Sequence, residues 1–396
     1  MKKLWVIISL LMLIISVNAY EMEEQVLKPN YYQHHSTTQN NIVQIKIKNN
    51  MLDANTANSL NSKNLIFSKT YALPYQSAEL SIDYLQVDDY NNEGQLIQTR
   101  TTHSIDIAKC ANQFTFKEMR GFTVHFNPVI KNQNGFSIVK NAEISLIGTG
   151  RMEMPSEISE AFVSLYENLA VNYSDSYLHN SPLKKPSMLI ISHNALANDL
   201  SSYVKWRKAS GFDVNVITKE TIGNNPTNTQ IKQAIVNFYN QATNKPDYLL
   251  LLGDSNVSSY YKLPTYYVNA PSYPELCATD LDYALISGED YFPEMLIGRM
   301  CIDSNTELQT ILSKTIRYER APATNTNSWQ NKALVVAGNY ASGSLIPTTP
   351  VDMSRWIYEK LRSSGYPQVD TVFYQNTSGS STAPEYLTTQ IINAIN

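Results

Sequence analysis

The hydrophobic positions of this chain follow two different periods along its length. In residues 20–185 they recur at every second position, as Val43, Ile45 and Ile47 show. Such alternation is typical of antiparallel strands that bury one face and expose the other to water. Asn and Gly turn signals, such as Asn-Asn-Glu-Gly at 91–94, separate the runs. The sequence therefore predicts a small all-β domain over residues 20–173.

From Met188 onward, short apolar runs alternate with helical stretches. The run Tyr248–Leu252 is apolar throughout, as expected for a strand that is covered on both faces. A helix is predicted over Asn305–Arg320, and others precede and follow it. This βαβ alternation predicts a mostly parallel, doubly wound sheet with helices on both faces. The fold class is α/β, and residues 188–396 form this second domain.

The segment between the two domains, residues 174–187, is polar and carries two prolines and the dibasic pair Lys184-Lys185. Polar, proline-containing segments are typical of exposed connections, where proteolytic cleavage concentrates. We therefore predict an exposed linker, and we expect it to be the most protease-sensitive internal segment.

The first 19 residues are predicted to be a signal peptide. Lys2 and Lys3 precede an apolar run, Leu4–Val17, and Val17-Asn18-Ala19 provides a cleavage site. A transmembrane anchor is the weaker alternative, because the run is shorter than the ~20 residues that span a bilayer. We expect cleavage after Ala19, no membrane anchor afterwards, and a secreted protein in the extracellular space or at the cell surface.

The overall charge excludes some partners. A net charge of −4 and a pI near 5.9 provide no field that attracts nucleic acid or anionic lipid. Three cysteines, Cys110, Cys277 and Cys301, are too few for a disulfide framework, although one pair remains open. They are interpreted as small buried hydrophobic residues. A monomer is expected.

Carboxylates gather on the loops that follow the run Tyr248–Leu252. Oxygen ligands of this kind, with backbone carbonyls between them, suit a hard cation such as Ca²⁺, whereas the absence of His and of paired Cys argues against zinc. A solvated acidic loop is the alternative. Residues 254–294 carry seven carboxylates: Asp254, Glu275, Asp280, Asp282, Glu289, Asp290 and Glu294.

Four ordered motifs in the second half resemble those of the gingipain-type cysteine peptidases, peptidase family C25. They are Leu-Leu-Leu-Leu-Gly-Asp at 249–254, Thr-Asp-Leu-Asp-Tyr-Ala at 279–284, Gly-Glu-Asp at 288–290 and Pro-Glu-Met-Leu-Ile-Gly-Arg at 293–299. In the first half, Glu-Met-Arg-Gly-Phe at 118–122 resembles the family's propeptide. The resemblance implies a propeptide followed by the N-terminal part of a caspase/gingipain-like catalytic domain. It also implies a secreted endopeptidase precursor that acts on protein and peptide substrates.

The same resemblance implies a structural calcium ion. Carried over position by position, its ligands are the carboxylates of Asp254, Asp290 and Glu294 and the backbone carbonyls of Ser287 and Phe292.

The catalytic dyad of the family has no counterpart in the sequence. The family places its His in a Gly-His-Gly strand end and its Cys in an Ala-Cys turn, and neither motif occurs in the 396 residues. No catalytic residue is assigned. We expect a catalytic domain that is incomplete at its C-terminus, a dyad beyond Asn396, and no peptidase activity in this chain alone.

Two other functions remain open. One is a secreted, non-catalytic binding or surface protein that uses the same scaffold. The other is a different enzyme with a dyad of His193 and either Cys277 or Cys301, although a lone His is more often structural.

Overall fold

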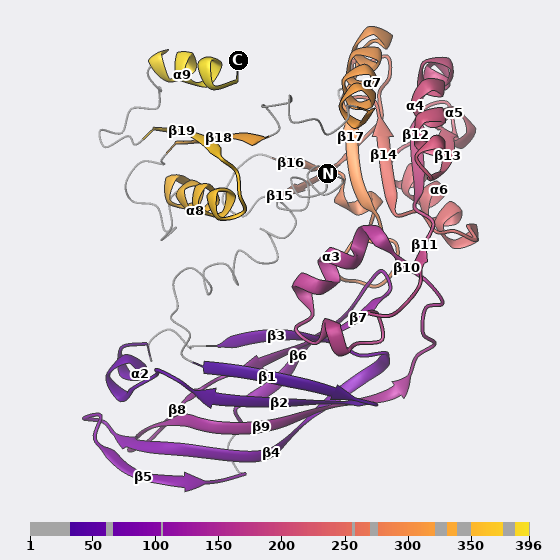
Figure 1. The fold of residues 1–396 in the computed structure, drawn as a ribbon. Helices are drawn as coiled ribbons and strands as arrows, with labels where there is room; N and C mark the ends of the chain where they lie inside the picture. The colour runs from indigo at the N-terminus through magenta and orange to yellow at the C-terminus, as the bar shows by residue number, and fades with distance from the viewer. Residues whose placement is uncertain are drawn as a thin grey trace. The chain divides into compact units, whose positions relative to one another are not determined.

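The computed structural model describes residues 32–60, 66–103, 106–255, 258–269, 276–320, 331–338, 350–374 and 385–395. The predicted signal peptide, residues 1–19, lies outside the described residues. The described residues form two compact units, one within residues 1–316 and the other within residues 317–396 (Figure 1). None of the helices in the described ranges is long and apolar enough to span a membrane.

The alternating segments of the first half are antiparallel strands, as predicted. These are β1 (Tyr32–Gln39), β2 (Ile42–Asn49), β3 (Phe67–Ala72), β4 (Tyr75–Asn91), β5 (Leu96–Thr101), β6 (Ala108–Phe116), β7 (Met119–Phe126), β8 (Val129–Asn132) and β9 (Gly135–Arg151). One sheet has the order β1-β2-β9-β4-β5, with β8 beside β9, and another has the order β3-β7-β6. Val43, Ile45 and Ile47 of β2 are buried in the core between them, which explains the period of two.

Short elements complete this half. They are α2 (Ala54–Leu60), β10 (Ile158–Ser159), α3 (Glu160–Leu169), the 3₁₀ turn η2 (Tyr173–Asp175) and β11 (Leu183–Lys184). The predicted linker, residues 174–187, packs closely against its surroundings: Leu178 is fully buried, and the Tyr177 hydroxyl donates to the Glu118 carbonyl. β11 pairs in parallel with β10. The protease sensitivity of the segment 174–187 stays a prediction.

A parallel sheet follows, in the strand order β13-β12-β14-β17. Its strands are β12 (Ser187–Ser192), β13 (Asp213–Thr218), β14 (Tyr248–Leu252) and β17 (Leu296–Met300). The helical elements around it are η3 (Asn194–Leu196), α4 (Ala197–Ala209), α5 (Lys219–Ile222), α6 (Asn228–Gln241), η4 (Leu281–Tyr283) and α7 (Asn305–Arg320). A hairpin of β15 (Tyr266–Asn269) and β16 (Leu276–Thr279) stands in the connection between β14 and β17.

Helices pack on both faces of this sheet. Ile190 of β12 belongs to a cluster with Leu200 of α4 and Leu308 of α7. Its neighbour Leu189, which points the other way, packs with Ile231 of α6. Because both faces are covered, β14 is apolar throughout, and its bounds are those that the sequence predicted.

The second unit is a βαβ element with one further helix. It contains β18 (Lys332–Gly338), α8 (Pro350–Ser363), β19 (Gln368–Tyr374) and α9 (Glu385–Ile395). β18 and β19 are parallel, which requires the crossover that α8 supplies. Val351 of α8 and Leu387 of α9 are buried.

Candidate functional site

The strand order of the parallel sheet reverses between β12 and β14. From β12 the chain passes to β13 on one side and then returns to β14 on the other. Ligands of open α/β sheets bind at the carboxyl ends of the strands at such a switch point. His193 follows β12 directly, and Gly253 and Asp254 follow β14. This carboxyl edge is therefore the candidate functional site.

His193 is engaged by protein groups at this edge. Its Nδ1 accepts a hydrogen bond of 3.1 Å from the Ala195 N–H, so the proton of the neutral ring lies on Nε2. Nε2 lies 3.3 Å from the carboxylate of Glu220 on α5. The rings of Tyr260 and Tyr261 lie 5.1 and 5.4 Å from the imidazole, centroid to centroid. Burial lowers the pKa of His193, although Glu220 opposes the shift. The neutral imidazole is the favoured form.

Arg299 of β17 connects three segments of the same edge. Its guanidinium donates to the Asp280 carboxylate through Nε at 2.8 Å and Nη2 at 2.7 Å. Nη1 donates to the carbonyls of Gly253 and Leu263 at 2.9 and 2.8 Å, and Nη2 reaches the Pro264 carbonyl at 3.3 Å. These bonds fix the loops that follow β14 and β16. In the sequence, Asp280 was grouped with the seven carboxylates that suit a cation, and Arg299 was noted only as part of a motif. The signal for this pair is an Arg inside an apolar strand, which needs a buried partner.

Gly253 is required where β14 ends. Its φ is +138°, and a Cβ at this position would meet the carbonyl oxygen of Tyr261 at 2.0 Å. Only Gly allows the backbone at residues 253 and 261 to approach so closely, next to the carbonyl that accepts from Arg299.

Cys301 follows β17 but lacks the surroundings of a nucleophile. Burial of the thiol and the carboxylate of Asp254 raise its pKa, Arg299 opposes them, and Asp280 adds to the rise. Reactive thiols need a lowered pKa. β14 lies between β12 and β17, so His193 and Cys301 follow strands about 10 Å apart. The arrangement does not support a dyad of these two residues.

The interpretation of the cysteines as small buried residues is wrong for two of them. Cys277 and Cys301 are exposed, Cys110 is partly buried, and all three thiols are free. Cys277 lies on the β15–β16 hairpin, where Tyr267 and Leu276 are also exposed. A short two-stranded hairpin has too little area to bury both of its faces.

The structure does not bring the five predicted calcium ligands together. Asp254 lies beyond the carboxyl end of β14, whereas Glu294 lies just before the amino end of β17. The two strands are parallel, with Tyr248 beside Leu296 and Leu252 beside Met300. A strand of this length puts the two edges about 13 Å apart. Asp254 therefore lies at one edge, and Ser287, Asp290, Phe292 and Glu294 lie on a loop at the other.

This loop is closed by hydrogen bonds of its own. The carboxylate of Glu294, 2% exposed, accepts from the Ile286 N–H at 2.5 Å and from the Ser287 hydroxyl at 2.6 Å. Asp290 accepts from the Phe292 N–H at 2.9 Å. Within the described ranges, no group of three or more His, Cys, Asp or Glu side chains is arranged as metal ligands. The loop's potential ligand atoms are all oxygen, which fits Ca²⁺, but both carboxylates already accept a protein hydrogen bond.

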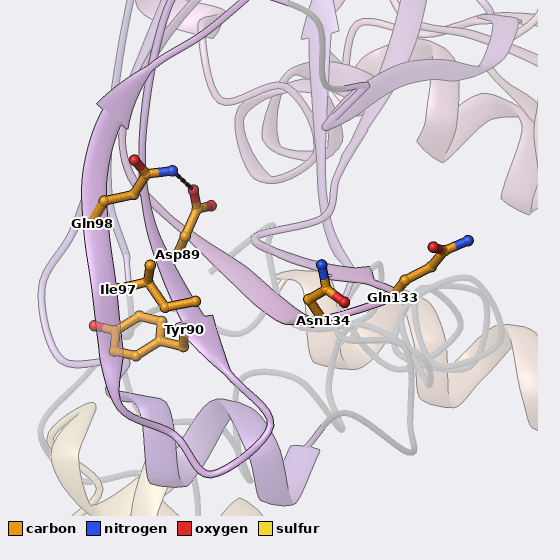
Figure 2. A pocket seen from close by; sticks show the side chains of 6 residues that line it. All are labelled: Asp89, Tyr90, Ile97, Gln98, Gln133 and Asn134. Atoms are coloured by element: carbon orange, nitrogen blue, oxygen red, sulfur yellow. Dashed lines mark hydrogen bonds between the residues drawn. The ribbon is translucent and has the colours of Figure 1, made fainter.

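A polar pocket lies in the N-terminal strands (Figure 2). It measures about 430 Å³, and Gln98 donates to Asp89 within it. Burial alone would raise the pKa of Asp89, but hydrogen bonds from Arg100, Ser137 and Gln98 lower it. Its carboxylate is thus satisfied by the protein, and the pocket contains no unpaired catalytic group among its described lining residues: Asp89, Tyr90, Ile97, Gln98, Gln133 and Asn134.

Comparisons with known proteins match more than half of the chain. The family model of peptidase family C25 matches residues 181–396. Gingipain R2 of Porphyromonas gingivalis (strain W83) is 26% identical over 241 residues, 59% of this chain and 31% of the relative. Lys-gingipain of P. gingivalis (strain ATCC 33277) is 30% identical over 240 residues, 57% of this chain and 13% of the relative. The chain thus spans less than a third of the length of these relatives.

Solved structures are also similar. The crystal structure of the Arg-specific cysteine proteinase gingipain R superposes with a TM-score of 0.43 and 23% identity, over 54% of this chain and 44% of that chain. The complex of the pro- and mature domains of P. gingivalis RgpB superposes with a TM-score of 0.43 and 24% identity, over 53% of this chain and 45% of that chain.

Proposed function

The chain belongs to peptidase family C25, and from this premise we propose that it is part of a secreted cysteine-type endopeptidase precursor. Residues 20–173 are the propeptide, 174–187 the linker, and 188–396 the N-terminal part of a doubly wound, gingipain-like catalytic domain. The family match over residues 181–396 carries the proposal. The four parallel strands, with helices on both faces, support it.

Peptide-bond hydrolysis in such an enzyme needs a thiolate, an imidazole and an oxyanion hole. We propose that the dyad lies in sequence that follows Asn396. Two observations support this assignment: His193 and Cys301 follow strands about 10 Å apart, and the pKa of Cys301 is raised. The role of the present residues is to build the carboxyl edge, where Arg299 fixes the loops that border the site.

The test compares the complete reading frame with residues 20–396. Both proteins are assayed with fluorogenic peptides that carry Arg or Lys before the scissile bond, because both a gingipain R and a Lys-gingipain are similar to this chain. The complete protein should cleave at least one peptide and lose activity with a thiol-alkylating reagent. Residues 20–396 should be inactive. Activity of residues 20–396 that Cys277→Ala or Cys301→Ala abolishes would overturn the assignment, as would an inactive complete protein without the two motifs.

We also propose a structural calcium ion on the loop 286–294. Asp290 and Glu294 would bind it through carboxylates, and Ser287 and Phe292 through backbone carbonyls. The oxygen-only donors on one short loop support this set. Asp254 is left out because it lies at the opposite edge of the sheet.

Calcium that binds only the folded chain should stabilise it by about 2.7 kcal/mol at 100 times Kd. Asp290→Asn should remove this gain, since a neutral amide is a weak Ca²⁺ ligand. Glu289→Gln is the matched control, because Glu289 is the exposed neighbouring carboxylate. Thermal unfolding with calcium and with a chelator measures the effect. A wild-type melting curve that the chelator leaves unchanged would remove the calcium proposal.

Export stays part of the proposal. The mature N-terminus should be Tyr20, and N-terminal sequencing of protein from the native host's medium or envelope tests it. Retention of Met1 on that protein would contradict a cleaved signal peptide.

A further inference from the structure

The tip of the β6–β7 hairpin places a lysine inside the amino edge of the parallel sheet. Lys117 has a left-handed φ of 51°, and its side chain is only 2% exposed. The ammonium donates to the carbonyls of Pro246 and Glu294, both at 2.9 Å. It also lies 5.0 Å from the centroid of the Phe162 ring and 5.5 Å from that of Tyr239. The hairpin therefore inserts a positive charge among carbonyls and ring faces, which favour a cation.

The carboxylate of Asp247, directly before β14, receives this lysine and a second one. Its Oδ1 lies 3.2 Å from the Lys117 Nζ and 2.7 Å from the Lys184 Nζ. Its Oδ2 accepts from the Ser187 N–H at 3.1 Å. Asp247 is 1% exposed and Lys184 10%. We call Lys117, Lys184 and Asp247 the two-lysine cluster.

The three members come from separate parts of the chain. Lys117 belongs to the β6–β7 hairpin, Lys184 to β11 in the segment that precedes the sheet, and Asp247 to the sheet itself. Beside the cluster, Phe114 and Phe116 of the same hairpin pack on Phe292, with ring centroids 4.0 and 5.2 Å apart. The hairpin thus contacts the sheet through one charge and a small aromatic group.

A buried carboxylate needs one cation, and here it has two. Left without a cation, it would retain most of its desolvation cost, which is why removing the partner of a buried charge is strongly destabilising. The second ammonium adds repulsion from the first, which the Pro246 and Glu294 carbonyls offset for Lys117. Removal of either lysine therefore leaves a paired carboxylate, and only removal of both leaves it alone.

We propose that Asp247 is a shared docking point on the sheet that accepts either lysine, so that the β6–β7 hairpin or β11 alone suffices to pair the buried carboxylate. The partner that this surface fits is a lysine-tipped hairpin with flanking aromatic rings, supplied by the chain itself. The inference goes beyond the proposed function, and depends neither on peptidase activity nor on calcium.

The test is a double-mutant cycle in the full chain, with Lys117→Met, Lys184→Met and the double variant. Hydrogen exchange is followed in the segments 187–192 and 247–252, because exchange there reports opening of the sheet. Of the single variants, Lys117→Met should have the larger effect, because the Pro246 and Glu294 carbonyls lose their donor. The double variant should raise the exchange rates by about 100-fold or more, well beyond the product of the two single effects. Lys185→Met is the control, since Lys185 and Asp213 form an exposed pair with 56% and 41% exposure. It should change nothing.

Two results would overturn the shared docking point. One is a double variant whose effect equals the product of the two single effects, because independent sites are additive. The other result applies if the double variant fails to fold. In that case Asp247→Asn is added to the double variant; this removes the lone buried carboxylate and should restore a folded chain. A triple variant that remains unfolded would show that the lysines act through something other than Asp247.

Discussion

The two edges of the parallel sheet use buried charge in different ways. At the carboxyl edge, ionisable groups pair one to one: the neutral His193 faces Glu220, and Arg299 binds Asp280. Each pair keeps some contact with solvent. His193 and Glu220 connect the segments that follow β12 and β13, and Arg299 of β17 binds the loop that follows β16. At the amino edge, one carboxylate is shared by two lysines and is almost fully buried.

The difference separates two tasks of a buried charge. A partly exposed pair at a switch point orders loops and leaves them accessible to a ligand. A fully buried cluster is inaccessible, and its partners come from segments that are far apart in the chain. The carboxyl edge is therefore the side suited to chemistry, and the amino edge is the side that joins the N-terminal strands to the sheet.

The largest expected effect is that of removing Arg299 from the carboxyl edge. Arg299→Met should lower the free energy of unfolding by about 3 kcal/mol or more, because Asp280 and three carbonyls lose their donor in a largely buried site. Urea denaturation measures the loss. Arg355→Met is the control, since Arg355 and Asp352 form an exposed pair that should contribute within about 0.5 kcal/mol. A loss at Arg299 no larger than that of the control would mean that the loops order themselves without it.

A smaller effect is expected at the amino edge, and it depends on pH. Burial lowers the pKa of Lys117 from its ordinary 10.5, with Asp247 and Glu118 opposing and Lys184 assisting. Between the lowered value and 10.5 the unfolded chain binds more protons, so the contribution of Lys117 to stability rises with pH. Lys117→Met should remove this rise.

The measurement is the free energy of unfolding of both proteins between about pH 8 and pH 9.5. This range avoids the nearby phenols of Tyr166 and Tyr239, whose pKa values burial raises. The free energy of unfolding of the wild type should increase relative to that of the variant as the pH increases. Parallel curves would mean that Lys117 has the same affinity for protons in the folded and unfolded chain.

Local pattern predicted the elements better than the site. The apolar run Tyr248–Leu252 matched β14 because a strand covered on both faces is apolar along its whole length, so the ends of the run mark the ends of the strand. The helix predicted over Asn305–Arg320 matched α7 as well. Both depend on residues close in sequence, and each element carries its own signal.

Contacts between distant residues could not be read in this way. Lys117 stands in a charged hairpin turn, which usually lies in solvent, and its partner is 130 positions further on, a separation that no local period contains. Asp254 and Glu294 were grouped as calcium ligands through the family resemblance, which was carried over position by position. A loop after one parallel strand and a loop before the next lie at opposite edges of the sheet, which a match of motifs does not show.

The smallest expected effect is that of His193. It sharpens the contrast between the edges, because it changes the stability at acidic pH, whereas Lys117 changes it at alkaline pH. Burial lowers the pKa of His193 from its ordinary 6.5; Glu220 opposes this and Lys219 adds to it, with Tyr260 and Tyr261 as the uncharged neighbours. Below pH 6.5 the unfolded chain then binds more protons, so the contribution of His193 is lost as the pH falls. His193→Gln should remove under about 1 kcal/mol of this acid loss, because the site is partly exposed.

The free energies of unfolding of the variant and the wild type between about pH 7.5 and pH 5 measure this loss, as the difference between the two proteins. That difference cancels the titration of His34, whose pKa burial lowers to about 4 in both proteins. His103→Gln, at an exposed position, should follow the wild type throughout. A His193 variant that differs from the wild type only above pH 8, where Lys117 should act, would mean that the two edges are not electrostatically separate.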